Sequence, residues 1–381
     1  MGRKLASIQR IKNIEPIEGA DKIEKLTVLG WHIVASKSEN HKIGDLVCYI
    51  EVDSQVPEIP MFEFLKDRKY RVRTIKLRKQ VSQGLVVPLR ELEKNFKIDI
   101  SKLQEGEDVT KLLGITKYDP QAEAEAKLME QELQKSKNKV HKYLMKFNMY
   151  RKMYCKLFPK QKSGFPSWIT KTDETRIQSI PDVFEEIINN SQVRNDYNTF
   201  DCTEKIDGQS STYYIKREKV FGIFSRYEFG VCSRNLRLKT RNNSSYWKME
   251  EKYKIENTLK KLLNKYHANS IVLQGEIVGD KIQGNKYKIE GQKFYAFNLI
   301  IDGKKHRTID MYKILKPYGI VTVPMLMTNI QLKDSIDDMV ADSEGKSSLY
   351  NTAREGIIWR NLENTISFKV INPKFLLKNG E

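Results

Sequence analysis

The most informative short segment of the chain is residues 203–208, which read Thr203-Glu204-Lys205-Ile206-Asp207-Gly208. The residues from Phe200 to Glu204 favour a strand, and the Asp-Gly pair that follows favours a turn. Such a connection can present Lys205 at the floor of a cleft. A lysine nucleophile attacks as the neutral amine, and an apolar neighbourhood or a nearby cation lowers its pKa toward that form. Taken alone, however, the segment is more often a plain turn in a chain with so many lysines.

Five further segments extend this pattern toward the C-terminus. One carries Arg234, two place the carboxylates of Glu276 and Glu355 beside apolar strands, one is an aromatic strand, and the last carries a second strand-borne lysine, Lys369. In chain order they are Ser233-Arg234-Asn235, Leu273-Gln274-Gly275-Glu276, Phe294-Tyr295-Ala296-Phe297-Asn298-Leu299, 354–360 and 367–372. Six segments in this order are a far more specific signal than the lysine segment by itself.

The order and spacing of the six segments resemble the nucleotidyltransferase motifs shared by ATP-dependent polynucleotide ligases and mRNA capping enzymes. The resemblance covers essentially all of residues 165–381. Two segments upstream, residues 168–178 and 76–88, resemble the RNA ligase 5 family, whose members carry an N-terminal OB domain. The run from Ile14 to Ile23 is similar to the start of tRNA-binding OB domains.

Working outward, the chain divides into three zones by composition. Residues 1–117 contain short strand-like runs bounded by Gly, Pro and Asp, which predict a small closed or nearly closed barrel. Residues 118–164 are predicted to be a basic helical linker. Residues 165–381 alternate predicted strands and helices. With the resemblance, the expected fold class is α+β: an N-terminal OB-fold β-barrel joined by the linker to a nucleotidyltransferase (adenylyltransferase) domain.

Within the third zone the residue patterns predict six strands and three helices. The strands are expected at Phe200–Glu204, Ser211–Lys216, Ile271–Ile277, Phe294–Ile301, Gly356–Trp359 and Ile366–Val370, and the helices at Ile180–Asn189, Lys248–Tyr266 and Thr308–Lys316. In the first zone, Tyr70–Leu77 alternates basic and apolar residues with period two, which predicts a strand.

The linker zone is strongly basic. From Lys135 to Lys162 it holds ten Lys or Arg and no Asp or Glu, and its aromatic residues recur at three- and four-residue spacing. This pattern predicts an amphipathic helix. We favour an aromatic stripe packed on a domain with solvated lysines. An RNA-contacting helix, or a membrane-surface or calmodulin-type target, are the alternatives.

The composition of the chain indicates which broad class of protein it belongs to. The chain has 381 residues with 39% hydrophobic and 10% aromatic residues, which is globular, and a formal charge of +18, which indicates a polyanionic partner. It contains no apolar run long enough for a membrane span and no apolar N-terminal signal core. Its four scattered cysteines favour neither disulfides nor zinc, so we expect an intracellular, reducing compartment. We also expect a monomer.

The resemblance implies an ATP-dependent RNA ligase that joins a 3′-OH end to a 5′-phosphate end. It implies that Lys205 takes AMP from ATP, that the RNA 5′-phosphate then receives the AMP, and that the 3′-OH finally expels it. Family members favour nicked duplex or bridged ends, so ATP and RNA are the expected partners. Asp207, Glu276 and Glu355 are implied ligands of Mg²⁺ or Mn²⁺, in part through water. Lys369 is expected to neutralise the α-phosphate.

Further residues are implied to bind the nucleotide. Tyr295 and Phe297 point to one face of their strand, and of the two we favour Phe297 for stacking on adenine. Arg234 is a candidate for the ribose or for the RNA 5′-phosphate. Glu204 is expected to accept from the adenine amino group through its backbone carbonyl, with no evident task for its side chain. For Arg176, nucleotide contact and packing are equally open.

The basic run of the barrel is the candidate nucleic-acid surface. Its members are Arg73, Lys76, Arg78 and Lys79. The chain also departs from the family pattern: many relatives carry a second lysine in the last motif, where this chain has Ile371, and no C-terminal basic motif for the pyrophosphate follows. The same four barrel residues are therefore candidates for that role.

Two other functions compete with the ligase. An mRNA capping guanylyltransferase uses the same lysine chemistry with GTP, but the N-terminal barrel and the segment at 168–178 argue against it. A catalytically idle RNA-binding protein is disfavoured because Lys205, Asp207, Glu276, Glu355 and Lys369 are all retained.

Overall fold

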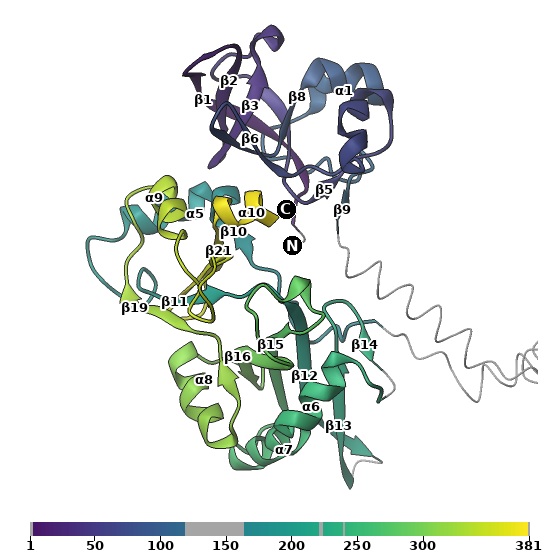
Figure 1. The fold of residues 1–381 in the computed structure, drawn as a ribbon, viewed down its shortest axis with the longest axis vertical. Coiled ribbons are helices and arrows are strands. Elements are labelled where there is room, and N and C mark those ends of the chain that lie inside the picture. The colour runs from purple at the N-terminus through teal and green to yellow at the C-terminus, as the bar shows by residue number, and fades with distance from the viewer. Residues whose placement is uncertain (1–2, 119–163, 221–223, 239–240, 380–381) are drawn as a thin grey trace, which may run out of the picture.

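The computed structural model describes residues 3–118, 164–220, 224–238 and 241–379. Figure 1 shows the N-terminal domain stacked on a larger C-terminal part that is itself built around two sheets. The expected α+β class, with a barrel-like domain first, is confirmed. The predicted basic helix of the linker lies outside the described residues. Within the described residues, no helix is long and apolar enough to cross a membrane.

The N-terminal domain is a strongly coiled antiparallel sheet in the strand order β3-β2-β1-β4-β8. Its long first strand pairs through its N-terminal half with β4 and through its C-terminal half with β2, and a register irregularity after Ile11 separates the halves. One strand can thus serve two parts of a half-barrel, because a bulge bends the strand and increases its twist. The strands are β1 (Ala6–Ile17), β2 (Ala20–Val28), β3 (Trp31–Ser36), β4 (Leu46–Ile50) and β8 (Leu85–Pro88).

The remaining elements of this domain are short strands and short helices. A hairpin of β6 (Thr74–Leu77) and β7 (Gln80–Gln83) packs beside β3, β5 (Ser54–Gln55) pairs with β9 (Thr116–Lys117), and α1 (Leu89–Phe96) follows β8. The predicted strand at 70–77 is therefore only half right. Tyr70 has a φ of 56°, at the end of a 3-10 helix (Pro60–Arg68), so the extended backbone begins at Thr74.

The first sheet of the C-terminal part has the order β10-β21-β20-β11-β19. Helices α5 (Pro181–Asn189) and α9 (Ile336–Asp342) contribute Phe184, Ile187 and Met339 to its apolar core. The strands are β10 (Thr175–Arg176), β11 (Phe200–Lys205), β19 (Met325–Ile330), β20 (Gly356–Asn361) and β21 (Ser367–Ile371), and α10 (Pro373–Asn379) follows β21.

The second sheet has the order β14-β13-β12-β15-β16-β17, with β18 beside β16. Three helices cover one face, as Figure 1 shows. The predicted helix at 248–266 is two helices, because Lys254 adopts a left-handed φ of 50° between them. The elements are β12 (Gln209–Val220), β13 (Phe224–Cys232), β14 (Arg237–Leu238), β15 (Ser270–Gly279), β16 (Gln292–Ile301), β17 (Lys304–Lys305), β18 (Val321–Thr322), α6 (Ser245–Tyr253), α7 (Ile255–Lys265) and α8 (Thr308–Leu315). All six strands predicted in this zone are confirmed.

The N-terminal domain docks on the first sheet through specific polar contacts. The Gly30 N–H donates to the carbonyl of Gln178 at 2.9 Å, and a side chain at Gly30 would approach the Gln178 backbone to about 3.0 Å. The Ser179 hydroxyl donates to Glu51 at 2.6 Å. Because backbone groups take part, this contact requires one relative orientation of the two domains.

Candidate active site

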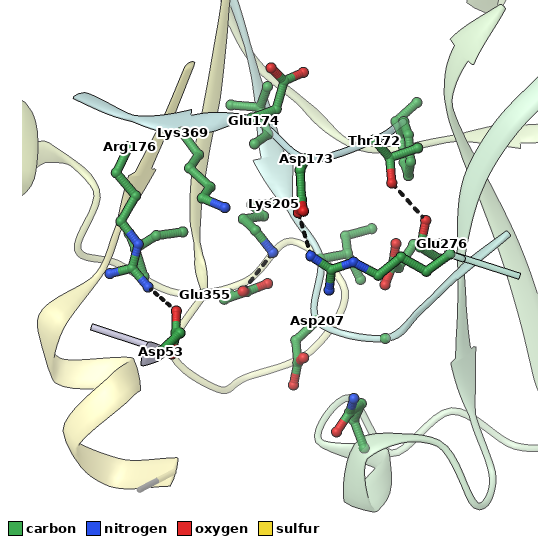
Figure 2. Close-up of a pocket in the computed structure, with 18 of the residues that line it drawn as sticks. Asp53, Thr172, Asp173, Glu174, Arg176, Lys205, Asp207, Glu276, Glu355 and Lys369 are labelled. Atoms are coloured by element: carbon green, nitrogen blue, oxygen red, sulfur yellow. Dashed lines mark hydrogen bonds and ion pairs between the residues drawn. The ribbon is translucent and has the colours of Figure 1, made fainter. Parts of the chain in front are cut away.

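A cavity of about 380 Å³ opens between the two sheets and is closed on one side by the N-terminal domain. The predicted residues that line it are Arg176, Glu204, Lys205, Asp207, Arg234, Glu276, Phe297, Glu355 and Lys369. These residues are spread over 194 positions of sequence, and the fold brings all of them to one place. Figure 2 shows most of them pointing into the same space.

Lys205 lies at the end of β11, and its neighbour across the ladder is Gly356, the first residue of β20. Glu355 comes just before that strand, so its Oε1 receives a hydrogen bond from Lys205 Nζ at 2.6 Å (Figure 2). A glycine is required at 356, because a Cβ there would lie 2.3 Å from the Val370 carbonyl oxygen. Glu355 Oε2 is buried with no hydrogen-bond partner.

The pKa of Lys205 is raised, contrary to the environment expected for a lysine nucleophile. Burial lowers the pKa of this amine, but the carboxylates of Glu355 and Glu276 outweigh burial. The sequence could indicate an apolar strand before the lysine, yet it could not show that two acidic side chains from other strands face it. In this arrangement Lys205 is an ammonium group.

Glu276 faces the same space from β15 and is the most perturbed carboxyl here. Its pKa is raised to about 8 by burial first and then by the nearby charges of Glu355 and Asp207, against the opposing charge of Lys205. Crowded, buried carboxylates are stable only when a cation or protons balance them. This part of the cavity therefore favours positive charge.

Asp207 follows Lys205 in the glycine turn, and a second loop holds it. Its carboxylate pairs with Lys286 Nζ at 2.5 Å, and its backbone N–H donates to the Tyr287 hydroxyl at 2.7 Å. In the part of the chain that the structure describes, no three His, Cys, Asp or Glu side chains gather closely enough to hold a metal ion directly. A cation at Glu276 and Glu355 would therefore be held partly through water.

Lys369 enters the cavity from β21. The pKa of its amine is lowered to about 7, by burial first and then by the charges of Arg176, Lys205 and Arg3. Arg176 is its ladder neighbour on β10. A site that gathers cations in this way is suited to bind an anion.

Arg176 also connects the two domains. Its guanidinium donates to Asp53 Oδ2 of the N-terminal domain at 2.8 Å, while its Nε and Nη1 are buried without a partner. Asp53 also accepts from Arg71 at 3.2 Å. Although burial opposes ionisation, Arg176, Arg3 and Arg71 hold the pKa of Asp53 well below its usual range. Of the two roles left open for Arg176, packing between domains is thus directly visible.

Phe297 lines the cavity, whereas Tyr295 is part of the buried cluster beside it. The pairing of β15 with β16 skips one residue, because Gln274 pairs with Asn298 and Gly275 with Ala296. This β-bulge leaves Phe297 unpaired, and bulges re-aim the side chains next to them. The sequence alone predicted strict alternation.

The side chain of Glu204, for which the sequence indicated no task, has one. It is buried, and it accepts hydrogen bonds from the Ser347 hydroxyl and from the Ser348 N–H at 2.7 Å. It thereby holds the loop that leads to Glu355.

Arg234 pairs with Asp173, which also receives a hydrogen bond from Lys117 Nζ at 2.6 Å. Despite burial, Arg234 and then Lys117 hold the pKa of Asp173 well below its usual range. Asp173 belongs to the segment at 168–178 that the sequence singled out. The structure shows this segment forming one wall of the cavity.

The four predicted nucleic-acid residues lie on the β6–β7 hairpin or directly before it, and none of them lines this cavity. Arg78 and Lys79 form the turn, with φ values of 47° and 67°. The N-terminal domain instead supplies Arg71, which lies just before the basic run, and residues that nothing local in the sequence marked: Arg3, Asp53, Lys117 and Tyr118.

Comparisons with known proteins agree with this geometry. A family model described as an OB-fold domain matches residues 5–89, and one described as RNA ligase matches residues 198–377. A search of curated proteins found no significant match.

Solved structures of Naegleria gruberi RNA ligase match the whole chain. An apo mutant is 30% identical with a TM-score of 0.73, covering 99% of this chain and 98% of that chain. A mutant with ATP and Mn is 29% identical with a TM-score of 0.75, covering 99% of this chain and all of the other. A third, with PPi, is 30% identical with a TM-score of 0.73 and covers 98% of both. The chain belongs to the ATP-dependent RNA ligase family and carries that family's N-terminal OB domain.

Proposed function

We propose that this protein seals RNA 3′-OH and 5′-phosphate ends, in nicked duplex or bridged substrates, through a lysyl-AMP and an RNA-adenylate. The observation that carries the proposal is the pair Lys205–Glu355, joined at 2.6 Å beside Glu276 and Lys369 in one cavity. This set combines a nucleophile, a carboxylate to hold its proton and a cation for a phosphate. The family match leaves no support for the guanylyltransferase or for the idle RNA-binding protein.

In the first step Lys205 Nζ attacks the α-phosphorus of ATP. The N–P bond forms, the bond to the bridging oxygen breaks, and pyrophosphate leaves with the electron pair. The raised pKa of Lys205 means that its ammonium must first lose a proton. Glu355 Oε1 is the hydrogen-bonded acceptor for that proton. Lys369 is placed to neutralise charge on the α-phosphate.

The carboxylates fit Mg²⁺ or Mn²⁺. Glu355 Oε2 is buried without a hydrogen-bond partner, and the pKa of Glu276 is raised, so an added cation would stabilise both carboxylates. The solved Naegleria structures with ATP and Mn support the same cofactors here. When bound, such a cation supplies positive charge that lowers the pKa of Lys205 and stabilises the negative charge on the phosphate in the transition state. Asp207, already paired with Lys286, is the third candidate ligand.

The nucleotide is proposed to enter between the two sheets. Phe297 from β16 and Ile358 from β20 line the cavity from different sheets and can hold the adenine between them. Glu204 fixes the loop at 347–348 beside it. Arg176 and Arg234 then remain for the phosphates and the ribose.

In the second step an oxygen of the RNA 5′-phosphate attacks the AMP phosphorus and Lys205 leaves as the amine. In the third step the RNA 3′-OH attacks the activated 5′-phosphate and expels AMP. The N-terminal hairpin, with Arg73, Lys76, Arg78 and Lys79, is the proposed surface for the RNA backbone. Because sealing serves many sequences, we expect phosphate contacts rather than base reading.

A labelled-ATP assay tests the proposal. Protein incubated with ATP labelled at the α-phosphate and Mn²⁺ should acquire label, and nicked RNA duplex should then take the label and be sealed. GTP in place of ATP should label nothing. A protein that takes label from GTP alone, or that keeps the label without ever passing it to RNA, would contradict the ligase reaction.

A further inference from the structure

A second cavity, of about 710 Å³, lies behind the wall of the first. The two cavities share Thr172, Asp173 and Glu174, so residues 172–174 separate them. The floor of the second cavity is the continuation of β15, where Val272 and Gln274 stand on the same face as Glu276. Its volume is in the range of cavities that hold a small molecule or a nucleotide.

The floor of this second cavity carries an open hydrogen-bond acceptor. Gln274 Nε2 donates to the Thr170 carbonyl at 2.9 Å, and Asn298 Nδ2 donates to Gln274 Oε1 at 2.8 Å. The last polar atom of this hydrogen-bonded series is Asn298 Oδ1. It is buried and has no hydrogen-bond partner, and Asn298 as a whole is only 5% exposed. Buried polar atoms are nearly always hydrogen-bonded to protein, water or ligand, so Asn298 Oδ1 is open to an N–H or O–H donor that enters the cavity.

The second feature of this cavity is a set of lysines that can bind an anion. Lys171, Lys304 and Lys305 line the cavity, and none of them has an ion-pair partner among the described residues. Burial, followed by the charge of Arg360, lowers the pKa of Lys305. A half-buried ammonium group such as that of Lys305 is stabilised by an incoming anion.

The carboxylates around the cavity offset these three lysines only in part. Glu174 pairs with Arg360 at 3.3 Å, and Asp173 pairs with Arg234 and Lys117 on the side of the first cavity. Asp310 and Glu363 also line the second cavity. Neither carboxylate forms an ion pair with a lysine, arginine or histidine among the described residues.

The third feature of the second cavity is an exposed aromatic ring. The Trp168 indole lines the cavity, is 41% exposed, and is held edge-on against Tyr214 at a centroid distance of 5.4 Å. Exposed aromatic rings beside lysines are the usual platform for unpaired bases.

We propose that this second cavity binds one unpaired ribonucleotide of the RNA substrate. A phosphate lies against Lys304 and Lys305, a base or ribose donor reaches Asn298 Oδ1, and the base stacks at Trp168. The inference rests on the proposed ligase function, and it adds a site that holds RNA apart from ATP. The shared wall at 172–174 connects this RNA to Arg234, the candidate for the 5′-phosphate.

The test measures binding of a short single-stranded, 5′-phosphorylated RNA to the full chain by fluorescence anisotropy over a series of salt concentrations. Lys304→Gln with Lys305→Gln should weaken binding about tenfold and reduce the salt slope by about 0.7 per lysine, the single-strand value. Trp168→Leu should weaken binding by about fivefold or more, yet keep the slope, since it removes stacking and no charge. The matched control, Lys313→Gln with Lys316→Gln on α8 and directly after it, removes two exposed lysines that line neither cavity.

Labelling of Lys205 from ATP, measured in parallel, separates this inference from the proposed function. Weaker RNA binding with unchanged labelling, and an unaffected control, support the cavity. Unchanged affinity and slope in both the lysine and the tryptophan variants overturn it, as does an equal loss in the control. A wild-type chain that takes no label refutes the ligase function itself, whatever the RNA binding shows.

Discussion

The two domains contribute unlike walls to the first cavity. On the C-terminal side, the charges are unbalanced: Glu276 has its pKa raised to about 8 and Lys369 has its pKa lowered to about 7. On the N-terminal side, Asp53 is saturated by Arg176 and Arg71, and its pKa is held well below the usual range. Perturbed groups mark sites of chemistry, whereas saturated ion pairs mark structural contacts. This difference supports the proposal that the C-terminal wall carries the chemistry and that the N-terminal wall fixes its geometry.

The largest expected effect is at the reacting wall. Lys205→Ala should abolish transfer of AMP to the protein, and Lys205→Arg should do the same because a guanidinium stays protonated. The readout is label from α-labelled ATP on the denatured protein. Full labelling of either variant would show that another residue is the nucleophile.

Next come the two carboxylates that face the lysine. Glu276→Ala and Glu355→Ala should each slow labelling by about 100-fold or more, the scale of losing a charge-stabilising group. Excess Mn²⁺ should restore part of the rate if both act through metal-bound water. Wild-type single-turnover rates in both variants would remove them from the mechanism.

The structural wall is tested at Asp53. Asp53→Asn should lower the free energy of unfolding by about 2 kcal/mol, because the charge-assisted hydrogen bonds disappear and the arginines are left facing one another. Since the folded-state pKa of Asp53 is depressed, its contribution is present at neutral pH and is lost as pH falls through the acid range.

Denaturant unfolding at pH 7 and in acid measures the free energy of unfolding that Asp53 contributes and how that contribution changes with pH. Asp67→Asn, an exposed aspartate with no ion pair among the described residues, is the control. Equal stability of the two variants at pH 7 would mean that Asp53 does not hold the domains together.

A smaller effect is expected from pH at Lys369. The amine is protonated below about pH 7 and loses its charge as pH rises, so ATP affinity should fall by up to about tenfold per pH unit above that value. Lys369→Gln should bind ATP more weakly at pH 6.5 and show a flatter profile. Parallel pH profiles for wild type and variant would assign the dependence to another group.

The smallest effect is expected at the hairpin, away from both walls. Arg73→Glu and Lys76→Glu should weaken binding of nicked duplex RNA modestly and lower its salt slope by about 0.9 for each phosphate that the variant no longer neutralises. ATP labelling should not change, since neither residue lines the cavity. An unaltered slope would place the RNA duplex elsewhere on the protein.

Much of this fold follows from local sequence. Strands β11, β12, β15, β16, β20 and β21 could be predicted because each is an apolar run bounded by turn residues. The lysine, both carboxylates and Lys369 could be recognised because the order and spacing of their segments resemble the nucleotidyltransferase motifs. The helix at 248–266 was only partly predictable, since its break at Lys254 has no glycine or proline to mark it.

Interactions across long sequence separations could not be predicted. Arg176 and Asp53 are 123 residues apart, and Lys205 and Glu355 are 150 apart. A short pattern does not indicate which distant side chain will face a given charge. For this reason the sign of the Lys205 pKa shift was missed, and the N-terminal lining of the cavity was assigned to the wrong arginines of the barrel.

The strand β16 shows most clearly which features the sequence determines and which depend on tertiary structure. Its sequence alone determined an aromatic, buried strand and placed Tyr295 and Phe297 on one face. Only the tertiary pairing with β15 created the bulge, which turns Asn298 to the same side of the sheet as Phe297 and Gln274 and so into the second cavity. The reason is physical: alternation is a property of one strand, whereas a bulge is a mismatch in length between two paired strands.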